Sequence, residues 1–457
     1  MYSPRKKFDA VVVGAGLSGA AACCNLCNIG LNVALVEALP LSEAGAGWIN
    51  AIPEKSFFDH GLEELDPAIL AYKGGRYIVQ SGQQKVFIKE TPLVQIDMKR
   101  LLGALHKRAE KLGATLFDRC RVVDMKFLKQ RPTGIALETR KPGSTPGILN
   151  LEASLFVDAS GITGAVRRRV PAMARFCRGP DESHVCNATQ ETWTVADGSG
   201  LKNFMEKHGI EPGDTIAWTG VEGGYSTLTL YVPAHMETLE LLAGSINLPR
   251  YRPGASILRD FCKQQPWIGR LVKSGSGTIP IRRPYDILAI PGLALIGDAG
   301  LQVFPAHGSG THSILTAAKI LADTVSPRAD PGGERSTWEY QAGFQRKVGA
   351  VHAVYDLVTR MTINNPASTT RALLENAILG PDQLTAGLCQ ELPPVTVGSL
   401  FKTFTKLGLI SKTGPLTVKA PLVHALYKAY PSKPDMDALG KWSRSVALLF
   451  SEDPDIL

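Results

Sequence analysis

The chain has 457 residues, a formal net charge of +8 and 44% hydrophobic residues. This length is sufficient for two or three domains with substantial cores. No apolar run approaches the roughly 18 residues that span a membrane, and the apolar run after the basic N-terminus is too short for a signal peptide. These features argue against a membrane-spanning chain and predict a cytoplasmic protein.

The first predicted element is a strand that ends at a glycine-rich turn. An apolar run to Val13 is followed by a G-x-G-x-x-G sequence and by an alanine-rich, helix-like stretch over 20–26. A second apolar run over 33–36 ends in Glu37, about 20 residues past the glycines. This order is typical of a strand–helix–strand unit that binds a dinucleotide.

The positions of this unit have distinct predicted roles. Gly14 allows the tight turn, Gly16 lets backbone N–H groups approach a pyrophosphate, and Gly19 lets the helix pack close to the strand. Ala15 belongs to the same turn, and the N-terminus of the helix favours the negative charge of the phosphates. Glu37 is placed to accept hydrogen bonds from an adenosine ribose.

Apolar periodicity predicts the elements that follow. They are an amphipathic helix over 97–112, strands over 121–128, 134–140 and 151–157, and a loop over 141–147. The last of these strands runs into the sequence Asp158-Ala-Ser-Gly161. An acid and small residues at a strand end place a backbone turn beside a cofactor, so Asp158 is a second candidate binding residue.

The middle of the chain differs in pattern from both flanks. Residues 171–284 alternate short strand-like runs with turns, as expected of a sheet domain inserted into a nucleotide-binding fold. We therefore predict a first part of the nucleotide-binding domain at 1–170, a substrate-binding sheet domain at 171–284 and the last part of the nucleotide-binding domain at 285–327. After a linker over 328–335, residues 336–457 are mostly helical in pattern.

A third glycine-containing sequence follows an apolar strand at 293–296. It begins Gly297-Asp298-Ala-Gly300 and continues through Pro305-Ala-His-Gly308-Ser309-Gly310 into a predicted helix over 311–325. Asp298 is placed to accept hydrogen bonds from the ribityl hydroxyls of FAD. The backbone from Gly308 to Gly310 and the helix N-terminus would stabilise the isoalloxazine edge that becomes negative on reduction. The sequence therefore predicts FAD as the cofactor.

The order and spacing of the three sequences at 14–19, 158–164 and 297–310 resemble those of a known family. This is the glutathione-reductase-like FAD superfamily of the para-hydroxybenzoate hydroxylase type, which includes aromatic hydroxylases, flavin-dependent halogenases and geranylgeranyl reductases. The resemblance covers about residues 8–325. It implies an α/β fold with a Rossmann-like FAD-binding domain, an inserted antiparallel β-sheet substrate domain and a helical C-terminal extension. The extension looks most like those of the reductase or halogenase branches.

Two positions depart from the hydroxylases of this family. Those proteins carry an arginine that contacts FAD at the start of the helix predicted over 97–112, but the aligned residue here is Met98. A basic residue often follows the acid of their second strand, but Ala38 follows Glu37. Arg100 is therefore our candidate for neutralising the pyrophosphate.

Geranylgeranyl reductases carry an aromatic-rich strand that ends in proline and is followed by glycine. Residues 228–233 and Gly244 fit this layout, but leucine and valine replace the aromatic residues. The resemblance then implies an aliphatic pocket wall, and a plain core strand is the alternative.

Halogenases carry a G-W-x-W-x-I-P motif in the substrate domain and a functional lysine. Residues 47–53 match in part, with Asn50 in place of the second tryptophan, but they directly follow the first strand–helix–strand unit. We interpret this segment as a loop near the flavin. Lys55 and Lys73 are candidates for the functional lysine of a halogenase, so this alternative stays open.

His307, His312 and Tyr225 are the candidate catalytic residues. The two histidines flank the flavin loop and titrate in a useful range, and Tyr225 is placed to hydrogen-bond a substrate. A structural role is the alternative for each. The sequence contains no readable Ser/His/Asp triad and no metal-ligand spacing, so we predict no metal.

The cysteines and the late basic residues point to simple structural roles. Cys24 and Cys27 form a C-x-x-C without a second pair nearby, so we expect buried free thiols. The late basic residues fit a solvated helical face, or alternatively a surface that contacts an anionic membrane or an acidic carrier protein. Nothing predicts nucleic-acid binding. The basic residues are Lys402, Lys406, Lys412, Lys419, Lys428, Lys433, Lys441 and Arg444.

These observations predict an FAD-dependent oxidoreductase that acts on a lipophilic small molecule. Hydride transfer to a carbon–carbon double bond is the preferred chemistry, with NAD(P)H or a flavin-reducing partner protein as the electron donor. A flavin monooxygenase that hydroxylates or epoxidises its substrate is the first alternative, and a halogenase is the next. A flavin-binding protein without turnover is the alternative outside the enzyme class.

Overall fold

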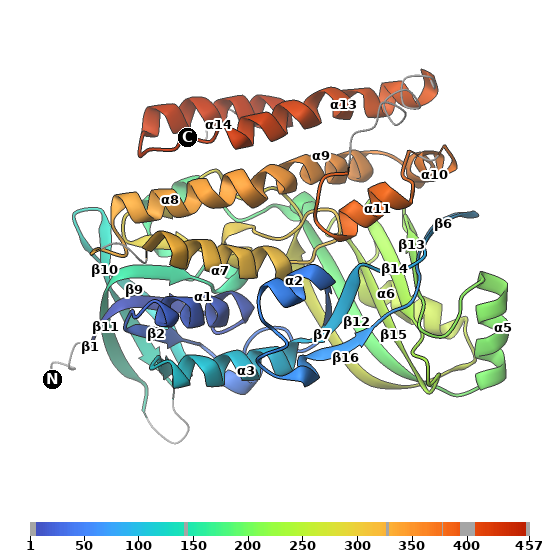
Figure 1. Cartoon of the computed structure of the whole chain (residues 1–457), viewed down its shortest axis with the longest axis horizontal. Helices are drawn as coiled ribbons and strands as arrows, with labels where there is room; N and C mark the ends of the chain where they lie inside the picture. Colours follow the sequence, from blue (N-terminus) through green and yellow to red (C-terminus); the bar gives the residue numbers. More distant parts are fainter. Residues whose placement is uncertain (1–5, 141–144, 326–328, 377, 394–406, 454–457) are drawn as a thin grey trace.

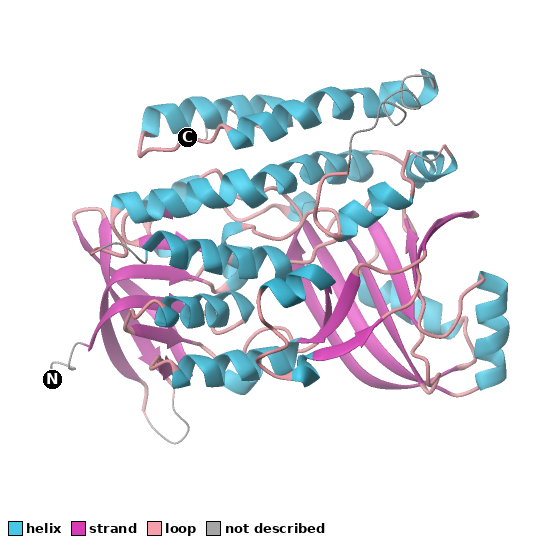
Figure 2. Cartoon of the chain, viewed as in Figure 1, coloured by secondary structure: helices cyan, strands magenta, loops and turns pink. Residues whose placement is uncertain are grey.

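Two large β-sheets lie side by side along the length of the molecule, and helices cover them (Figures 1 and 2). The computed structural model describes residues 6–140, 145–325, 329–376, 378–393 and 407–453. Several residues discussed above lie outside the described residues or have side chains that do. They are 141–144 of the predicted loop, Arg328 of the predicted linker, Lys402, Lys406 and the side chain of Lys412.

The N-terminal sheet has eight strands and carries the three glycine-containing turns. Its main order is β17-β18-β11-β1-β2-β8, and β10 and β9 extend it from β11. The core strands are continuous apolar runs because helices cover both faces of a parallel sheet. The strands are β1 (Lys6–Val13), β2 (Val33–Val36), β8 (Thr115–Phe117), β9 (Cys120–Leu128), β10 (Arg131–Thr139), β11 (Gly147–Asp158), β17 (Ala289–Ile290) and β18 (Leu293–Leu295).

The register of the parallel strands brings their carboxyl ends to one edge of this sheet. Val13 pairs with Val36 and with Asp158, and Asp158 in turn pairs with Leu295. Ligands of open α/β sheets bind at this edge. Three helices pack around it, namely α1 (Leu17–Asn28), α3 (Met98–Lys111) and α7 (Thr311–Val325).

The second sheet has seven strands in the order β16-β12-β15-β14-β13-β5-β6. All neighbours are antiparallel except β13 and β5. Two of its strands, β5 and β6, come from within the segment 1–170, so this sheet draws on more of the chain than 171–284. The strands are β5 (Tyr77–Ser81), β6 (Gln84–Ile88), β12 (Val185–Val195), β13 (Thr215–Thr219), β14 (Ser226–Tyr231), β15 (Thr238–Ile246) and β16 (Ile268–Pro280).

Smaller elements surround the two sheets. A three-stranded sheet has the order β3-β7-β4, and α5 and α6 belong to the side of the second sheet (Figure 1). These elements are β3 (Ile49–Pro53), β4 (Leu70–Lys73), β7 (Leu93–Asp97), α2 (Glu54–Asp59), α4 (Pro171–Phe176), α5 (Gly198–His208) and α6 (Gly254–Lys263).

The C-terminal part is helical and forms layers at the top of Figure 1, with α13 and α14 outermost. Its buried side chains join the same hydrophobic core as those of β1, β2 and α1. Within the described ranges, no helix combines the length and apolarity needed to cross a bilayer. The predicted fold class is confirmed. The helices are α8 (Glu334–Phe344), α9 (Ala350–Asn364), α10 (Ala367–Glu375), α11 (Pro381–Leu388), α13 (Leu407–Lys428) and α14 (Met436–Phe450).

Candidate cofactor and active site

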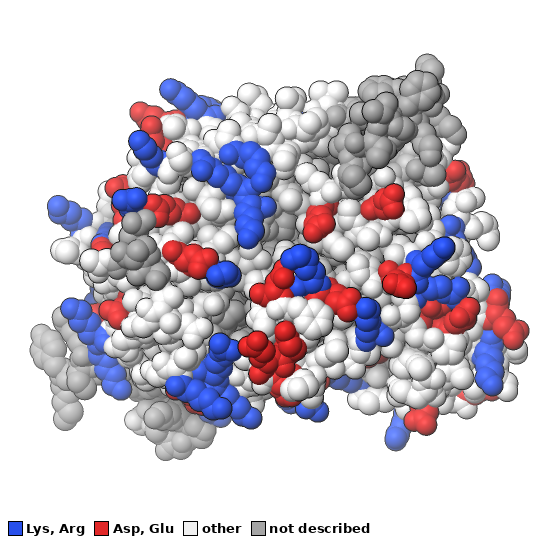
Figure 3. Space-filling view, viewed as in Figure 1, with Lys and Arg blue, Asp and Glu red and all other residues white. Residues whose placement is uncertain are grey.

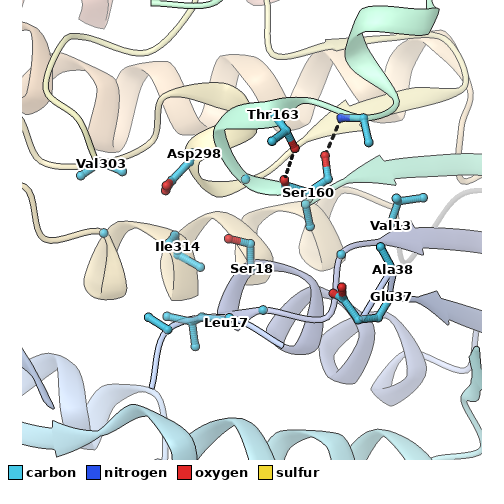
Figure 4. Close-up of a pocket in the computed structure, with 18 of the residues that line it drawn as sticks. Val13, Leu17, Ser18, Glu37, Ala38, Ser160, Thr163, Asp298, Val303 and Ile314 are labelled. Atoms are coloured by element: carbon cyan, nitrogen blue, oxygen red, sulfur yellow. Dashed lines mark hydrogen bonds between the residues drawn. The ribbon is translucent and has the colours of Figure 1, made fainter. Parts of the chain in front are cut away.

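A cavity of about 1010 Å³ opens at the carboxyl ends of β1, β2 and β11. All three predicted glycine-containing turns contribute to its wall. In Figure 4, Glu37 and Ala38 lie on one side of it, Asp298 and Val303 lie on the other, and Ser18 and Ser160 lie between them. The cavity therefore extends from the end of β2 to the loop that precedes α7.

The first turn is built around two glycines that no other residue can replace without a clash. Gly14 has a φ of +102°, and a Cβ atom there would lie 2.3 Å from the carbonyl oxygen of Ala159. A Cβ atom on Gly19 would lie 1.7 Å from the carbonyl oxygen of Gly14. Gly14 and Gly16 line the cavity, whereas Gly19 serves the close packing of α1 on the turn.

Glu37 lies at the end of β2, in the cavity wall. Its carboxylate accepts hydrogen bonds from the backbone N–H groups of Ala15, at 2.7 Å, and Leu39, at 3.0 Å. Ala15 is fully buried and contributes to the site through this backbone contact. The carboxylate is thereby fixed where the dinucleotide-binding unit holds a ribose.

Asp158 lies behind the cavity wall, and its side chain holds the backbone of the second turn in place. Its side chain is fully buried and accepts hydrogen bonds from the backbone N–H groups of Ser160, Val166 and Arg167 at 2.6–3.1 Å. The cavity itself is lined by the loop that Asp158 holds, which includes Ser160 and Thr163 (Figure 4). Asp158 therefore shapes the site, and the loop residues face the space.

The third turn supplies the opposite end of the cavity. Asp298 faces the space, and burial raises its pKa to about 6. Gly308, Ser309 and Gly310 line the same end, and Ser309 Oγ donates a hydrogen bond to the carbonyl oxygen of Ala51 at 3.2 Å. The loop before α7 is thus anchored to β3.

Gly297 and Pro305 support this end without lining the cavity. Gly297 has a φ of +73°, and a Cβ atom there would lie 2.0 Å from Ser18 Oγ. The Gly297 N–H donates to Gln302 Oε1 at 2.9 Å. The carbonyl oxygen of Pro305 accepts a hydrogen bond from the Tyr225 hydroxyl at 3.2 Å.

The cavity fits FAD by its size and by an unsatisfied helix end. The N-terminus of α1 has no side-chain cap and no acidic residue in its first turn, and Gly16, Leu17 and Ser18 line the cavity there. Free N–H groups and the positive end of the helix dipole form a binding site for an anionic group such as a pyrophosphate. Glu37 and Asp298 would then hold hydroxyl groups on either side of it.

Arg100 lies away from the cavity lining. Its side chain is 57% exposed, and its Nε atom lies 4.0 Å from Asp97 Oδ2. Asp97 caps α3 by accepting from the backbone N–H groups of Lys99 and Arg100, and the Arg100 side chain lies on the exposed face of this helix. Arg121 and Arg168, which the sequence analysis did not select, are in the lining instead.

The two candidate histidines flank the loop before α7, as expected. His307 packs against Phe304 with the rings tilted by 46° and their centroids 4.7 Å apart, and its side chain keeps an exposed edge. The surrounding protein displaces water from its ring and lowers its pKa to about 4. His312 Nδ1 lies 2.7 Å from Ser56 Oγ, and burial lowers its pKa as well. Both rings are therefore neutral at pH 7 and lie beside the cavity lining.

Tyr225 connects the second sheet to the flavin loop. Its hydroxyl donates to Pro305, and burial raises its pKa well above the usual range. It therefore keeps its proton and acts as a hydrogen-bond donor. The carbonyl that it binds belongs to the loop that carries Gly308.

Trp48 and Asn50 line the cavity and were not selected as site residues. The interpretation of this segment as a loop near the flavin agrees with their position. The indole of Trp48 lies over β16, where Cβ atoms on Gly275 and Gly277 would lie 3.3 Å and 2.7 Å from ring atoms. Gln190 of β12 binds both the N–H and the carbonyl of Ile49 at 2.9 Å. The partial halogenase-like motif at 47–53 was the feature of the sequence from which these two lining residues could have been selected.

The cysteines and the possible metal ligands of the described residues form neither a disulfide nor a metal site. None of the eight cysteines, all of which lie in the described ranges, forms a disulfide, and burial is the largest cause of the raised pKa of Cys24 and Cys177. No group of three or more His, Cys, Asp or Glu side chains in the described part of the chain is arranged to hold a metal ion.

Comparison with known proteins identifies relatives that match over nearly the whole chain. No known family profile matches. A digeranylgeranylglycerophospholipid reductase from Sulfolobus acidocaldarius is 22% identical over 98% of both chains. The crystal structure of a geranylgeranyl bacteriochlorophyll reductase-like protein from Thermoplasma acidophilum is 15% identical, has a TM-score of 0.70, and covers 90% of this chain and 100% of its own.

A structure from the halogenase branch has the same fold. The flavin-dependent brominase Bmp2 has a TM-score of 0.62 at 15% identity, covering 88% of this chain and 98% of its own. The predicted family and enzyme class are thereby confirmed, and the family implies FAD as the cofactor. Over almost its whole length the chain is thus similar in sequence to an FAD-superfamily reductase, and it shares its fold with a geranylgeranyl-reductase-like flavoprotein and with a flavin-dependent brominase.

Proposed function

We propose that the chain is an FAD-dependent reductase that transfers hydride to carbon–carbon double bonds of a lipophilic, isoprenoid-type substrate. The observation that carries this proposal is the similarity to the Sulfolobus acidocaldarius reductase over 98% of both chains. A match of that extent includes the second sheet and the C-terminal helices as well as the cofactor domain. FAD, when bound and reduced by the electron donor, would supply the hydride and return to its oxidised state. NAD(P)H or a flavin-reducing partner protein is the proposed electron donor.

The end of the cavity near Gly308 is suited to a lipophilic substrate. Trp48, Ile279, Val303 and Ile314 line it there. These side chains offer no hydrogen bonds beyond the indole N–H and exclude water from the space beside the loop. In the proposal they orient an apolar chain, while Glu37, Asp298 and the N-terminus of α1 hold the cofactor.

The histidines are proposed to move the proton that accompanies hydride transfer. His307 and His312 are neutral at pH 7 because their pKa values are lowered. A neutral imidazole can take up a proton at one ring nitrogen as it releases one from the other. The exposed edge of His307 makes it our candidate for passing solvent protons toward the loop that carries Gly308. Tyr225 is proposed to position that loop.

The halogenase alternative requires a lysine in the cavity. Lys55 and Lys73 instead lie on the surface, where they pair with Asp59 and with Glu54. Both lysine side chains are at least half exposed. This placement favours the reductase over the halogenase. The monooxygenase alternative is tested by the experiment below.

The test reduces the flavin-loaded protein with dithionite under argon and adds a lipid that carries geranylgeranyl chains. We expect mass spectrometry to detect a gain of two hydrogens for each reduced double bond. A parallel reaction in air with NADPH separates the alternatives, because gain of an oxygen atom would support a monooxygenase. The Gly14→Val variant is the control, since its side chain would occupy the first turn and remove flavin binding.

A further inference from the structure

The outermost helices, α13 and α14, expose an apolar face. Val418 and Leu422 on α13 are 62% and 52% exposed, and Leu448 on α14 is 69% exposed. Val418 and Leu422 are four residues apart, so they lie on the same side of their helix. The exposed residues Pro421 and Ala425 lie along the same stripe. Large aliphatic side chains that gather at a surface indicate a contact with something outside the molecule.

Basic residues border this apolar face. Lys428 on α13 and Lys441 and Arg444 on α14 are exposed, and Lys419 is half-buried. The sequence between Glu391 and Asp435 contains no acidic residue. It carries the six lysines 402, 406, 412, 419, 428 and 433. Of these lysines, the structure describes the side chains of Lys419, Lys428 and Lys433. Together with Lys441 and Arg444 they outnumber the exposed Asp435 and Asp437 at the start of α14, and this excess of positive charge favours an anionic partner.

The two helices form one surface. The indole N–H of Trp442 on α14 donates to the carbonyl oxygen of Leu426 on α13 at 2.8 Å, and the rings of Trp442 and Tyr427 pack edge to face at 5.0 Å. Figure 1 shows the pair as the top layer of the molecule. In Figure 3 the described part of this edge is mostly uncharged, with basic and a few acidic side chains toward its left end.

We propose that the outer face of α13 and α14 docks on an anionic lipid surface. Aliphatic side chains beside lysines are the combination by which helices bind at a membrane interface, where the apolar groups enter the acyl boundary and the cations contact the headgroups. A second copy of the chain fits this face less well, because a two-fold contact would bring two basic faces together. The proposal does not depend on the proposed reductase activity.

The test measures co-sedimentation of the flavin-loaded full chain with vesicles of phosphatidylcholine, with and without phosphatidylglycerol. We expect binding to the anionic vesicles, weakened by salt. Each basic residue near an anionic surface contributes about fivefold to binding, so Lys428→Ala with Lys441→Ala should lower it about 25-fold. The matched control is Lys202→Ala with Lys207→Ala on α5, which removes the same charge elsewhere and should leave binding unchanged.

A second variant tests the apolar part of the face. Val418→Ser with Leu422→Ser should reduce the binding that persists at high salt, and the exposed Leu128→Ser on β9 should not. Each variant must keep its flavin and its melting temperature. Equal binding to neutral and anionic vesicles, or equal loss in the α5 control, would overturn the proposal. It would also be overturned by a dimer that the serine variants disrupt, or by capture of an acidic protein without vesicle binding.

Discussion

Single side chains explain why the cavity accepts a cofactor with both anionic and hydroxyl groups. Glu37 is fixed by two backbone N–H groups, so it needs no rearrangement before it binds a ribose. Asp298 lies in a less polar place, and burial raises its pKa to about 6. The two carboxyl groups therefore respond differently to pH.

Asp298 is predicted to destabilise the flavin-free protein at neutral pH. Its pKa is higher in the folded chain than in the unfolded one, so the folded state binds more protons and stability falls as pH rises from about 4 to about 6. The full effect is at most about 3 kcal/mol. Asp298→Asn should therefore raise the melting temperature of flavin-free protein most at pH 8, with a gain that shrinks toward pH 4. A gain that does not vary with pH would contradict this explanation.

Glu37 is predicted to contribute to flavin affinity. Glu37→Gln keeps the shape of the side chain, but its amide can offer only one acceptor oxygen where the carboxylate offers two. We expect flavin affinity to fall about tenfold, which corresponds to loss of roughly one charge-assisted hydrogen bond. Quenching of flavin fluorescence on titration measures this. Glu110→Gln, an exposed change on α3, is the control and should bind flavin normally.

The sequence predicted the residues of the glycine turns better than the direction of long side chains. Gly14, Gly16 and Gly308 line the cavity because their places depend on the backbone pattern. Arg100 points outward because it lies on the exposed face of α3, where its guanidinium is 4.0 Å from Asp97, whereas Met98 and Leu101 lie on the buried face. Asp158 was placed at the correct turn, but its carboxylate faces the loop backbone.

At the scale of elements, the part of the cavity wall that carries Trp48 depends on the contact between the segment before β3 and β16. The segment that ends in β3 lies against β16, where Gly275 and Gly277 leave space for the indole of Trp48. The glycines of β16 and the tryptophan are more than 200 residues apart in the sequence. No local pattern relates them, so this contact was not predictable from the sequence.

Gly277→Ala is predicted to displace Trp48. The new Cβ atom would lie 2.7 Å from the indole, and such overpacking costs about 1–3 kcal/mol. Trp48→Phe should recover part of this loss, so a double-mutant cycle of unfolding free energies should show coupling. Gly103→Ala on α3 is the matched control, because its Cβ atom would meet open space. Additive effects of the two changes would argue against the contact.

A largely buried ion network links the C-terminal end of the described chain to the rest of the molecule. Glu452 contacts Arg283 at 2.6 Å, Arg360 at 2.5 Å and Arg282 at 3.3 Å. Arg360 also pairs with the fully buried Asp356 of α9. The network joins the residues after α14 to α9 and to the segment that follows β16.

Glu452→Gln is predicted to be strongly destabilising. Burial opposes charging of this group, but the three arginines dominate and hold its pKa well below the usual range. Its contribution is therefore present above about pH 4.3, the ordinary pKa of glutamate, and is lost as pH falls. Breaking a buried pair leaves unpaired cations and costs about 3–5 kcal/mol. Because the folded-state pKa lies so far below the usual range, most of the contribution is lost only below pH 4. Chemical denaturation at pH 7 and at about pH 2.5 measures this, and an equal loss at both would contradict it.

The overall architecture was predictable because it follows from apolar runs and turn sequences. The strands that end at Val13, Val36 and Asp158 could be placed from their length and from the residues that follow them. The addition of β5 and β6 to the second sheet could not, because β5 pairs with β13 across more than 130 residues. The domain limits at 170, 284 and 327 remain predictions.

The order of pairing in the first sheet also bears on synthesis of the protein. β1 lies between β2 and β11, and β11 completes its pairing only with β18, so the cofactor turns come from three distant parts of the chain. A ribosome must release nearly 300 residues before Asp298 can join Gly14. In contrast, β12 to β15 follow one another within residues 185–246 and can pair with one another earlier. Flavin capture is therefore expected to be a late event that follows release of most of the chain.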